Sequence, residues 1–481
     1  MKRHVFLLFF LLLAGFGSAS GQTPILQWNQ TFSFGGTSDQ MRALAMDSAG
    51  NYYVGGERAD TDVIATVTKL SPERVQLWTS ADTVDFQPFV WDLAFSEAHQ
   101  LVLSGNANGY VVAYDTAGNE RWRTFVETAP LIQVFGDSIL AVPIGENVRA
   151  VILNGAGTII REFPIMSISR YLWDAEILGD DIWVFGGDYD GALWNAGIFV
   201  SKFNLRTGEH LWTYHVPDGL PASGDVDEEG NAYLGATRLV WDPPGGTNQV
   251  WISKIDPSGN ALWETAWFAN SDPQANFETY IAGVAVSDSR SGARQVIIAG
   301  QTQKWDSSEH TGERSAYMAG LDAGTGDTLW IRKWEQVVGE HSSFLNDAFF
   351  DSRNRLIVGG NYFFYPPVVG KCFVESYEIP GVTLAVRELP LGVPEQFALS
   401  QNYPNPFNPK TLVRFEIPSV TDVKLVVYNA LGEEVAVLAE GRMNPGFYEA
   451  DWDATGMPSG MYFYRLRTET FSETKKMLLV K

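Results

Sequence analysis

A unit of four short apolar runs returns seven times along the chain, and this repetition restricts the possible folds more than any other feature of the sequence. The second run of each unit ends in small residues, and its copies are YYVGGE (from residue 52), LVLSGN (101), ILAVPIG (139), IWVFGGD (182), AYLGAT (232), VIIAGQ (296) and LIVGGN (356). The third run alternates apolar and polar residues, and its copies are ATVTKL (65), YVVAYD (110), VRAVIL (148), FVSKFN (199), WISKID (251), YMAGLD (317) and FVESYE (373). Short runs of this kind with turn residues between them predict units of four β-strands.

The fourth run predicts how the repeat closes. It usually carries Leu-Trp after a Gly-containing turn, and its six copies are ERVQLWT, GNERWRT, GTIIREF, GEHLWTY, GNALWET and GDTLWIR. The seventh unit has no such copy, but ILQWNQTF, from residue 25, supplies the missing run. If the strand over residues 25–34 completes the last unit, a ring closes and no unit is left incomplete. We therefore predict an all-β chain in which residues 22–380 form a seven-bladed β-propeller.

Two features shared by the units are explained by packing and by turn chemistry. Trp78, Trp122, Trp212, Trp263 and Trp330 recur at one position of the fourth run, where we expect them to pack between neighbouring blades. The turns DSAGN, DTAGN and DPSGN lack the spaced ligands and the downstream Glu of an EF-hand loop, so we interpret them as tight turns. No cofactor is predicted, although calcium stays open as a ligand.

Charge and the N-terminus limit the partners and the compartment. The formal net charge of −23 argues against nucleic acid and anionic lipid as partners. Lys2 and Arg3 precede the apolar run VFLLFFLLLAGF and the small residues GSASGQ, so residues 1–21 are predicted to be a signal peptide. No later run is long and apolar enough to predict a transmembrane segment. Cys372, the single cysteine, has no internal disulfide partner and is expected to be buried.

Motifs of catalytic sites are scarce. The chain has no Gly-x-Ser-x-Gly elbow, no His-Glu-x-x-His and no phosphate-binding loop. The units resemble repeats of secreted bacterial β-propellers, including outer-membrane-type quinoproteins, and DTAGNERW and DAGTGDTLW are the closest matches. For a quinone-dependent dehydrogenase that resemblance implies paired cysteines and a calcium site, so the single cysteine argues against this activity. Carboxylate pairs drawn from different blades leave glycoside cleavage open.

Loop lengths indicate which face of the ring binds a ligand. Successive strands reverse direction, so the loops after the second and fourth runs lie on one face. In the last four units the loops after the second run are long and rich in aromatic and acidic residues: 188–197, 238–249, 303–315 and 362–370. Since loops on a rigid scaffold often carry binding residues, the candidate ligand-binding residues are Asp188, Asp190, Trp194, Trp241, Asp242, Trp305, Asp306 and Tyr365. The alternative is that these aromatic residues only hold the loops in place.

The composition changes past residue 380. Residues 381–395 contain prolines and no repeat, and we interpret them as a linker. The runs TLVRFEIP, VKLVVYNA, EEVAVLAE, GFYEADWDA, GMYFYRLRTE and SETKKMLLVK then predict a small C-terminal β-sandwich. Just before them, NYPNPFNPKT (402–411) is too rich in proline to form a helix or a central strand.

FALSQNYPNPFNPKTLVRFEIP, together with VYNALGEEVAVL, WDATGMPSGMYFYRL and the final KKMLLVK, resembles the type A C-terminal sorting domain of the type IX secretion system, over residues 396–481. The residues of its sorting motif are Tyr403, Pro404, Asn405, Pro406, Phe407, Asn408 and Pro409, and Lys410-Thr411 stands where Thr-Thr or Ser-Thr is usual. The string is stiff and polyproline-like, and we expect Tyr403 and Phe407 to pack on the first strands. The resemblance implies export through the periplasm of a Bacteroidota-like cell by the type IX machinery, and a secreted or outer cell-surface location.

The sequence therefore favours a secreted or cell-surface propeller that binds a glycan or a protein partner through the face with the long loops, without catalysis. Two alternatives stay open. One is a polysaccharide-degrading hydrolase or lyase that uses the acids of that face, and the other is a structural or adhesion scaffold.

Overall fold

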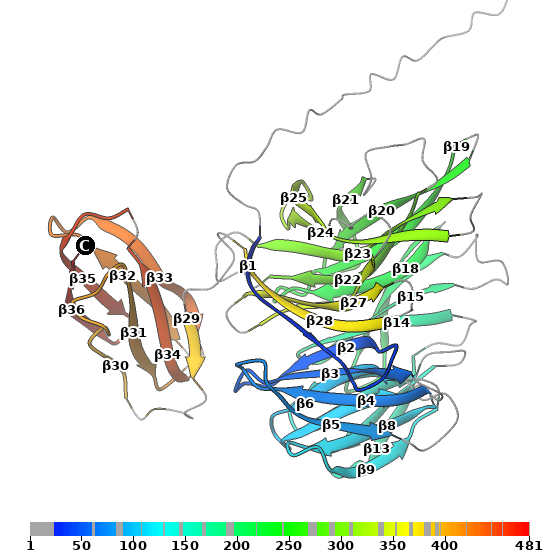
Figure 1. The fold of residues 1–481 in the computed structure, drawn as a ribbon. Helices are drawn as coiled ribbons and strands as arrows, with labels where there is room; N and C mark the ends of the chain where they lie inside the picture. Colours follow the sequence, from blue (N-terminus) through cyan, green and yellow to red (C-terminus); the bar gives the residue numbers. More distant parts are fainter. Residues whose placement is uncertain are drawn as a thin grey trace, which may run out of the picture.

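The computed structural model describes residues 24–59, 63–82, 90–106, 108–127, 130–143, 148–165, 170–188, 197–217, 219–242, 245–267, 277–287, 294–306, 311–334, 341–351, 354–364, 369–379, 386–389, 394, 396–419, 421–443, 445–454 and 456–480. Within these ranges every regular element is a β-strand, which confirms the predicted all-β fold class (Figure 1). The predicted signal peptide lies outside them, and it stays a prediction together with the domain boundaries.

The strands between residues 25 and 378 form seven four-stranded sheets, six of them built from consecutive strands. The first sheet contains β2 (Gln40–Met46), β3 (Tyr52–Ala59), β4 (Val63–Leu70) and β5 (Gln76–Asp82). The second contains β6 (Val90–Ser96), β7 (Leu101–Asn106), β8 (Tyr110–Asp115) and β9 (Glu120–Phe125). The third contains β10 (Pro130–Phe135), β11 (Ser138–Pro143), β12 (Arg149–Asn154) and β13 (Ile159–Pro164). The fourth contains β14 (Arg170–Leu178), β15 (Asp181–Asp188), β16 (Ile198–Asn204) and β17 (His210–Val216). The fifth contains β18 (Leu220–Val226), β19 (Ala232–Asp242), β20 (Gly245–Ile255) and β21 (Ala261–Trp267). The sixth contains β22 (Phe277–Val286), β23 (Gln295–Asp306), β24 (Thr311–Asp322) and β25 (Thr328–Lys333).

The seventh sheet joins the two ends of the repeat region. It contains β26 (His341–Phe350), β27 (Leu356–Phe364), β28 (Val369–Glu378) and, as its outer strand, β1 (Ile25–Phe32). Figure 1 shows β1 running beside β28, and their register begins with Ile25 opposite Glu378. Asn361 of β27 then ties this sheet to the first one, because its buried amide accepts from the Met41 backbone N–H (2.8 Å) and donates to the Met41 carbonyl (3.0 Å). Cys372 of β28 is a free, fully buried cysteine, as predicted.

Tryptophans of the outer strands connect each sheet to the next. The indole N–H groups of Trp78, Trp122, Trp212 and Trp263 each donate to a turn carbonyl of the following sheet, at 2.9 to 3.1 Å. The same turns carry glycines with positive φ. A Cβ atom on any of them would clash with the indole, as at Gly157, where it would lie 2.5 Å from Trp122. The expected packing between blades is therefore confirmed. Trp330 differs in its hydrogen bond, which goes to Gln295 of its own sheet (2.9 Å).

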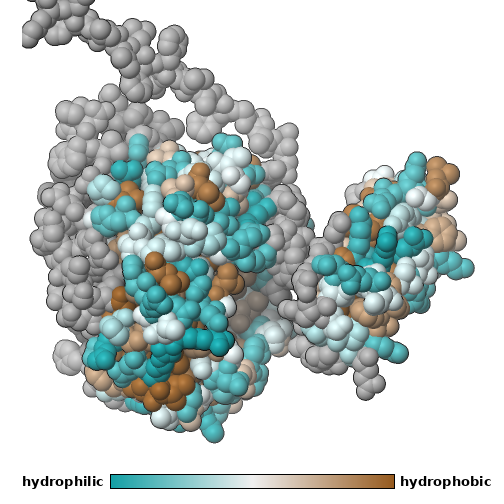
Figure 2. Space-filling model, turned by 180° about the vertical axis from the view of Figure 1, so that it is seen from behind, coloured by the Kyte–Doolittle hydropathy of each residue, from teal (hydrophilic) through white to brown (hydrophobic). Residues whose placement is uncertain are grey.

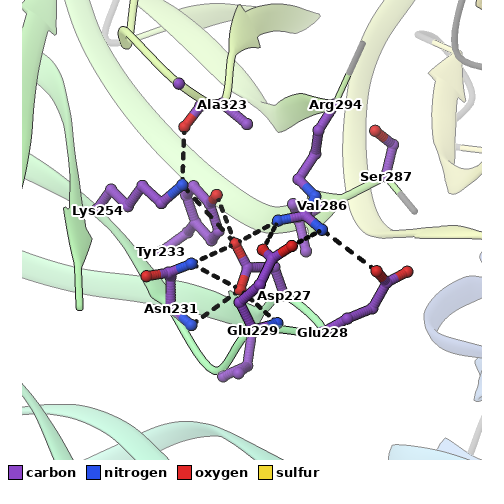
Figure 3. A network of polar contacts seen from close by, with 12 residues as sticks. Asp227, Glu228, Glu229, Asn231, Tyr233, Lys254, Val286, Ser287, Arg294 and Ala323 are labelled. Atoms are coloured by element: carbon purple, nitrogen blue, oxygen red, sulfur yellow. Dashed lines mark hydrogen bonds and ion pairs between the residues drawn. The ribbon is translucent and has the colours of Figure 1, made fainter. Parts of the chain in front are cut away.

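A charged network reinforces the contact between the fifth and sixth sheets (Figure 3). Asp227, in the turn after β18, accepts from Asn231 and from the Tyr233 hydroxyl (2.9 Å), which closes the turn. Arg294, just before β23, donates to Asp227 (2.7 Å) and also pairs with Glu229. Because Asp227 is nearly fully buried, its charge needs these partners, and the two sheets are held together as a result.

Two of the loops predicted to be long are instead mostly extensions of hairpin strands. Residues Arg238–Asp242 of β19 pair with 245–249 of β20. This hairpin extends beyond the end of β18, whose first residue pairs with Thr237. Residues 303–306 of β23 pair in the same way with 311–314 of β24. Both expectations were wrong because the turn residues between the strands occupy only a few positions, and the flanking residues complete the ladder. Figure 1 shows β19 projecting from the ring.

The remaining strands form two further four-stranded sheets. One has the order β29 (Val386–Leu389), β34 (Gly446–Asp453), β31 (Lys410–Ile417), β30 (Ala398–Leu399), and the other β33 (Glu434–Met443), β32 (Thr421–Tyr428), β35 (Gly460–Arg467), β36 (Ser472–Leu479). Their inner faces share one apolar core that includes Phe415 of the first sheet and Tyr464 of the second. Part of the predicted linker, Val386–Leu389, is thus a strand of this domain.

The face seen in Figure 2 is largely hydrophilic, with separate apolar patches. Several exposed apolar side chains lie on the outer strands of the seven sheets, among them Leu77, Phe125 and Ile160. Their exposure agrees with outer positions in a ring, because an outer strand has no further sheet to cover it.

Candidate functional site: the central channel

The first strands of the seven sheets line a central channel with a cavity of about 590 Å³. These strands are β2, β6, β10, β14, β18, β22 and β26. A cavity of this size lies within the range of small-ligand sites, about 300–1,000 Å³. The chemistry of the channel therefore depends on which first-strand residues face it.

A β-bulge recurs at the same point of six first strands and fixes one residue of each at a corresponding place in the ring. The residues directly after the irregularity are Ala43, Asp92, Asp174, Ser223, Gly283 and Asp347. A bulge re-aims a side chain relative to the regular pleat, and bulges are frequent beside functional sites. Three of the six positions thus place a carboxylate on the channel wall.

Each of these carboxylates reaches the first strand of the next sheet. Asp92 accepts from the Ile132 backbone N–H (2.7 Å). Asp347 accepts from the Leu44 N–H (2.8 Å), across the point where the ring closes. Asp174 accepts from the Ser223 hydroxyl (2.7 Å) and, at 3.3 Å, from the Gly224 N–H. The acids therefore help to hold the sheets together around the channel, and they also present their remaining acceptor positions to it.

Two more acids form a second tier. Glu176 and Asp225 each lie two residues beyond the bulge position, on β14 and β18. Asp225 accepts from the Val286 N–H (2.7 Å), and Glu176 is 3.5 Å from the Gln133 amide nitrogen of the neighbouring strand. The first strands thus carry five channel carboxyl groups on two levels, and Asp351, just after β26, also lines the cavity.

Burial raises the pKa of all five acids. It raises the pKa of Asp92, Asp225 and Asp347 to about 7. The pKa of Asp174 is also raised by burial, and that of Glu176 is raised well above its usual range by burial and then by the charges of the other channel acids. These side chains are half-buried and lie within the ring of sheets, so their charged forms are poorly solvated. Near neutral pH the wall can therefore both donate and accept hydrogen bonds.

Aromatic rings complete the lining. Trp173, in the bulge next to Asp174, is 43% exposed, which is unusual for a tryptophan inside a ring of sheets. Trp91 takes the same position beside Asp92. An accessible indole next to hydrogen-bonding carboxyl groups suits a ligand with both apolar faces and hydroxyl groups. No group of three or more His, Cys, Asp or Glu side chains in the described ranges is arranged to hold a metal ion.

Five of the eight site residues predicted from the sequence fall within the described strands. Asp188, Trp241, Asp242, Trp305 and Asp306 lie at the ends of β15, β19 and β23, where Trp241 pairs with Gly246 and Trp305 pairs with Gly312. Asp190, Trp194 and Tyr365 lie outside the described residues. These eight positions stay predictions.

The channel residues were not among the residues predicted from the sequence, although the sequence carries a signal for them. The first runs read VWDLAF, LWDAEI and LNDAFF, and each has an aspartate at the same place. An alignment of the first runs, rather than of the second to fourth, would have shown this acid. The bulge that turns it into the channel is not visible in the sequence, because it depends on the register between two strands.

The sorting segment of the C-terminal domain is held on both sides. Phe407 is buried against Trp452, and its backbone pairs with β36 through bonds to the Leu478 carbonyl and the Val480 N–H, each 3.0 Å. The Asn405 side chain accepts from the Leu478 N–H (3.0 Å). The last strand of the domain thus fixes the middle of the motif.

One residue of this segment differs from the expectation, and a second explains how a departure from the family pattern is accommodated. Tyr403 is 78% exposed and does not pack on the sandwich, because only its backbone pairs, with Leu412. Thr411 is buried and donates to the Pro404 carbonyl (2.8 Å), whereas Lys410 is exposed. Lys410, which departs from the family pattern, therefore lies at an exposed position outside the apolar core.

One family model matches the C-terminal part of the chain, and several solved structures resemble a larger part of it. Residues 401–481 match the family described as the secretion system C-terminal sorting domain. No curated protein sequence matches the chain. Similar solved structures include the Dos1 propeller (10% identity, 74% of this chain and 97% of that chain, TM-score 0.47), a chain of the mitotic checkpoint complex (10%, 79% and 99%, 0.46) and BamB from Moraxella catarrhalis (10%, 70% and 85%, 0.38).

The chain is therefore a β-propeller protein with a C-terminal sorting domain. It is exported by the type IX secretion system, whose machinery its C-terminal domain engages, to the cell surface or the extracellular space. The described part of the chain contains no helix that is long and apolar enough to cross a membrane.

Proposed function

We propose that this exported propeller binds a neutral glycan in the central channel and at the end of it that carries the extended hairpins. The observation that carries the proposal is the exposed indole of Trp173 in the wall of a cavity lined by carboxyl groups. Sugars offer an apolar ring face and several hydroxyl groups, so an aromatic platform beside acceptors recognises both.

The register of β14 relates Trp173 to the predicted binding face. Arg170, the first residue of β14, pairs with Asp188, the last residue of β15. Trp173 therefore lies close to the end of the sheet from which the hairpins β15–β16, β19–β20 and β23–β24 continue. We propose that Trp241, Asp242, Trp305 and Asp306 extend the binding surface beyond the channel, for a longer glycan or a protein partner.

A polysaccharide hydrolase is the second candidate, and one observation favours it. A carboxyl group whose pKa is raised to about 7, as for Asp92 and Asp347, has the protonation behaviour of a general acid. The hydrogen bonds of these groups to the next sheet equally serve the ring itself. Release of reducing ends from a bound polysaccharide, lost in Asp92→Asn or Asp347→Asn, would identify this activity.

The binding proposal is tested on the chain from residue 22 with a panel of neutral oligosaccharides. A thermal-shift screen selects ligands, because a ligand at 100 times its dissociation constant adds about 2.7 kcal/mol of stability. Calorimetry then compares Trp173→Ala with Leu178→Ala, an exposed position of the same strand outside the cavity. Trp173→Ala is expected to weaken binding about tenfold or more, or roughly 1.4 kcal/mol, and Leu178→Ala to leave it unchanged. Equal affinity of all three proteins, or no ligand in the panel, contradicts the proposal.

A further inference from the structure

A second cavity, of about 530 Å³, lies where the seventh sheet meets the first. Its walls include Trp28 of β1, Tyr52 of β3, Arg74 from the turn between β4 and β5, Glu97 and Arg355. The turns that surround it connect the first strands to the second and the third to the fourth. This seam pocket therefore opens at the end of the sheets with short turns, opposite the extended hairpins.

The seam pocket exists because this junction between sheets differs from the others. At four other junctions the outer-strand tryptophan is covered by a turn glycine and donates its indole N–H to a turn carbonyl, as Trp122 does to Gly155 (2.9 Å). At the seam the turn carries Arg74, whose backbone has a φ of 68° and whose guanidinium lies 5.1 Å from the Trp28 ring. Among the described residues, the Trp28 indole N–H has no hydrogen-bond partner.

The acids of the seam pocket already accept hydrogen bonds. Asp47 accepts from the Asn51 side chain (2.7 Å) and the Tyr53 hydroxyl (2.9 Å). Glu97 accepts from the Ser48 N–H (2.5 Å) and from Gln100 (3.2 Å). Asp351 pairs with Arg355 at 2.6 Å.

Three donors of the pocket, the Trp28 indole N–H, the Arg74 guanidinium and the Tyr52 hydroxyl, are in the opposite situation. The Arg74 guanidinium makes no ion pair and no hydrogen bond within the described residues, and the same holds for the Tyr52 hydroxyl. The Tyr52 ring packs edge-on against Trp28, with ring centroids 5.2 Å apart. Three donors from three strands or turns therefore surround one space, and one of them carries a positive charge. Such a set is complementary to an anionic acceptor.

The remaining charges of the pocket restrict the ligand further. Two arginines and three acids line it, so a multiply charged anion is repelled by the acids. A ligand with one acid group and several hydroxyl groups avoids this, since its hydroxyls can donate to the free lone pairs of Asp47 and Glu97. We propose that the seam pocket binds an anionic sugar unit whose acid group, a carboxylate or a sulfate ester, pairs with Arg74. The proposal is independent of glycan binding in the channel.

The test uses calorimetry on the chain from residue 22 with galacturonic acid, galactose 6-sulfate, the methyl ester of galacturonic acid, galactose and sodium sulfate. We expect at least one of the two acid sugars to bind, and which one it is distinguishes a uronic acid from a sulfated sugar. The ester and galactose are expected to bind at least about tenfold more weakly, because they lack the charge that Arg74 recognises.

Two variants and a matched control locate the site. Arg74→Gly removes the guanidinium at a backbone position that glycine adopts without strain, so the fold is expected to persist. It should lower the affinity for the acid sugar about tenfold or more. Trp28→Phe keeps an aromatic ring but loses the indole N–H, and it should lower the affinity several-fold. Arg206→Ala removes an exposed arginine from the corresponding turn of the fourth sheet and should have no effect. Unchanged affinity in Arg74→Gly or in Trp28→Phe, absence of binding by both acid sugars, or equally tight binding of sodium sulfate overturns the proposal.

Discussion

The contact between Trp122 and Gly157 allows the coupling between neighbouring sheets to be measured by a single methyl group. Gly157 lies in the turn between β12 and β13 with a φ of +76°, and a Cβ atom there would be 2.5 Å from the Trp122 ring. In Gly157→Ala, the left-handed backbone conformation costs about 1 kcal/mol for a residue with a side chain. Displacement of the indole adds about 1–3 kcal/mol, as for overpacking in a core. We therefore expect a loss of about 2–4 kcal/mol in the free energy of unfolding.

Gly136 provides the matched control within the same sheet. Its φ is +54°, but a Cβ atom there would meet nothing within 4 Å. Gly136→Ala should consequently cost only the backbone part, about 1 kcal/mol. The assay is equilibrium unfolding in urea, followed by tryptophan fluorescence and compared at the transition of the propeller. Equal destabilisation by the two substitutions would refute the reasoning, because the indole contact would then contribute nothing.

Three further predictions follow from the channel, from the ring closure and from the sorting segment. Burial raises the pKa of Asp92, Asp225 and Asp347 to about 7, so the fold favours their protonated forms. The melting temperature should therefore fall as the pH rises from about 4 to about 7. A melting temperature that is flat or rises over this interval contradicts the raised pKa values. Asn361→Ala leaves the Met41 backbone groups unpaired and should lower the free energy of unfolding by about 2–4 kcal/mol in urea titrations, whereas a change below about 0.5 kcal/mol would show that the ring closes without it. Deletion of residues 472–481 removes the strand that holds Asn405 and Phe407, so the protein should be absent from the culture medium and the cell surface in fractionated cells, and normal export of this variant would refute the role of that strand.

The repeat made the ring of sheets predictable from the sequence. The second, third and fourth runs are strands whose alternation and turn residues are local signals, and the Leu-Trp pattern marks the outer strand of most units. Trp78 and Trp263 recur because each sheet needs the same contact with its neighbour. A contact that most units make leaves a periodic trace, and a periodic trace can be recognised without a structure.

Features that occur once, or that depend on register, were not predictable in this way. The aspartates of the channel owe their direction to bulges, and a bulge is a property of two paired strands. The hairpin residues after Thr237 appeared to be loop because aromatic, glycine and proline residues surround a very short connection. Tyr403 appeared to be a packing residue because it is large and aromatic, but the backbone pairing with Leu412 leaves its side chain in solvent.

The seam pocket shows the same limit at a single position. Arg74 occupies a turn in which other sheets place a glycine over the tryptophan, and the sequence SPERV gives no sign of a binding site. The sequence shows that the glycine is missing, but only the structure shows that its absence leaves a pocket beside Trp28. In a repeat protein, sites of this kind are best sought where one unit breaks the pattern that the others keep.

The most direct test of the account is a crystal structure of the chain from residue 22 with the neutral oligosaccharide that gives the largest rise in melting temperature. We predict a sugar ring stacked on Trp173, with hydroxyl groups hydrogen-bonded to Asp174 or to the other channel acids. A sugar bound to another surface, with the channel filled only by water, would contradict the assignment of the channel as the binding site.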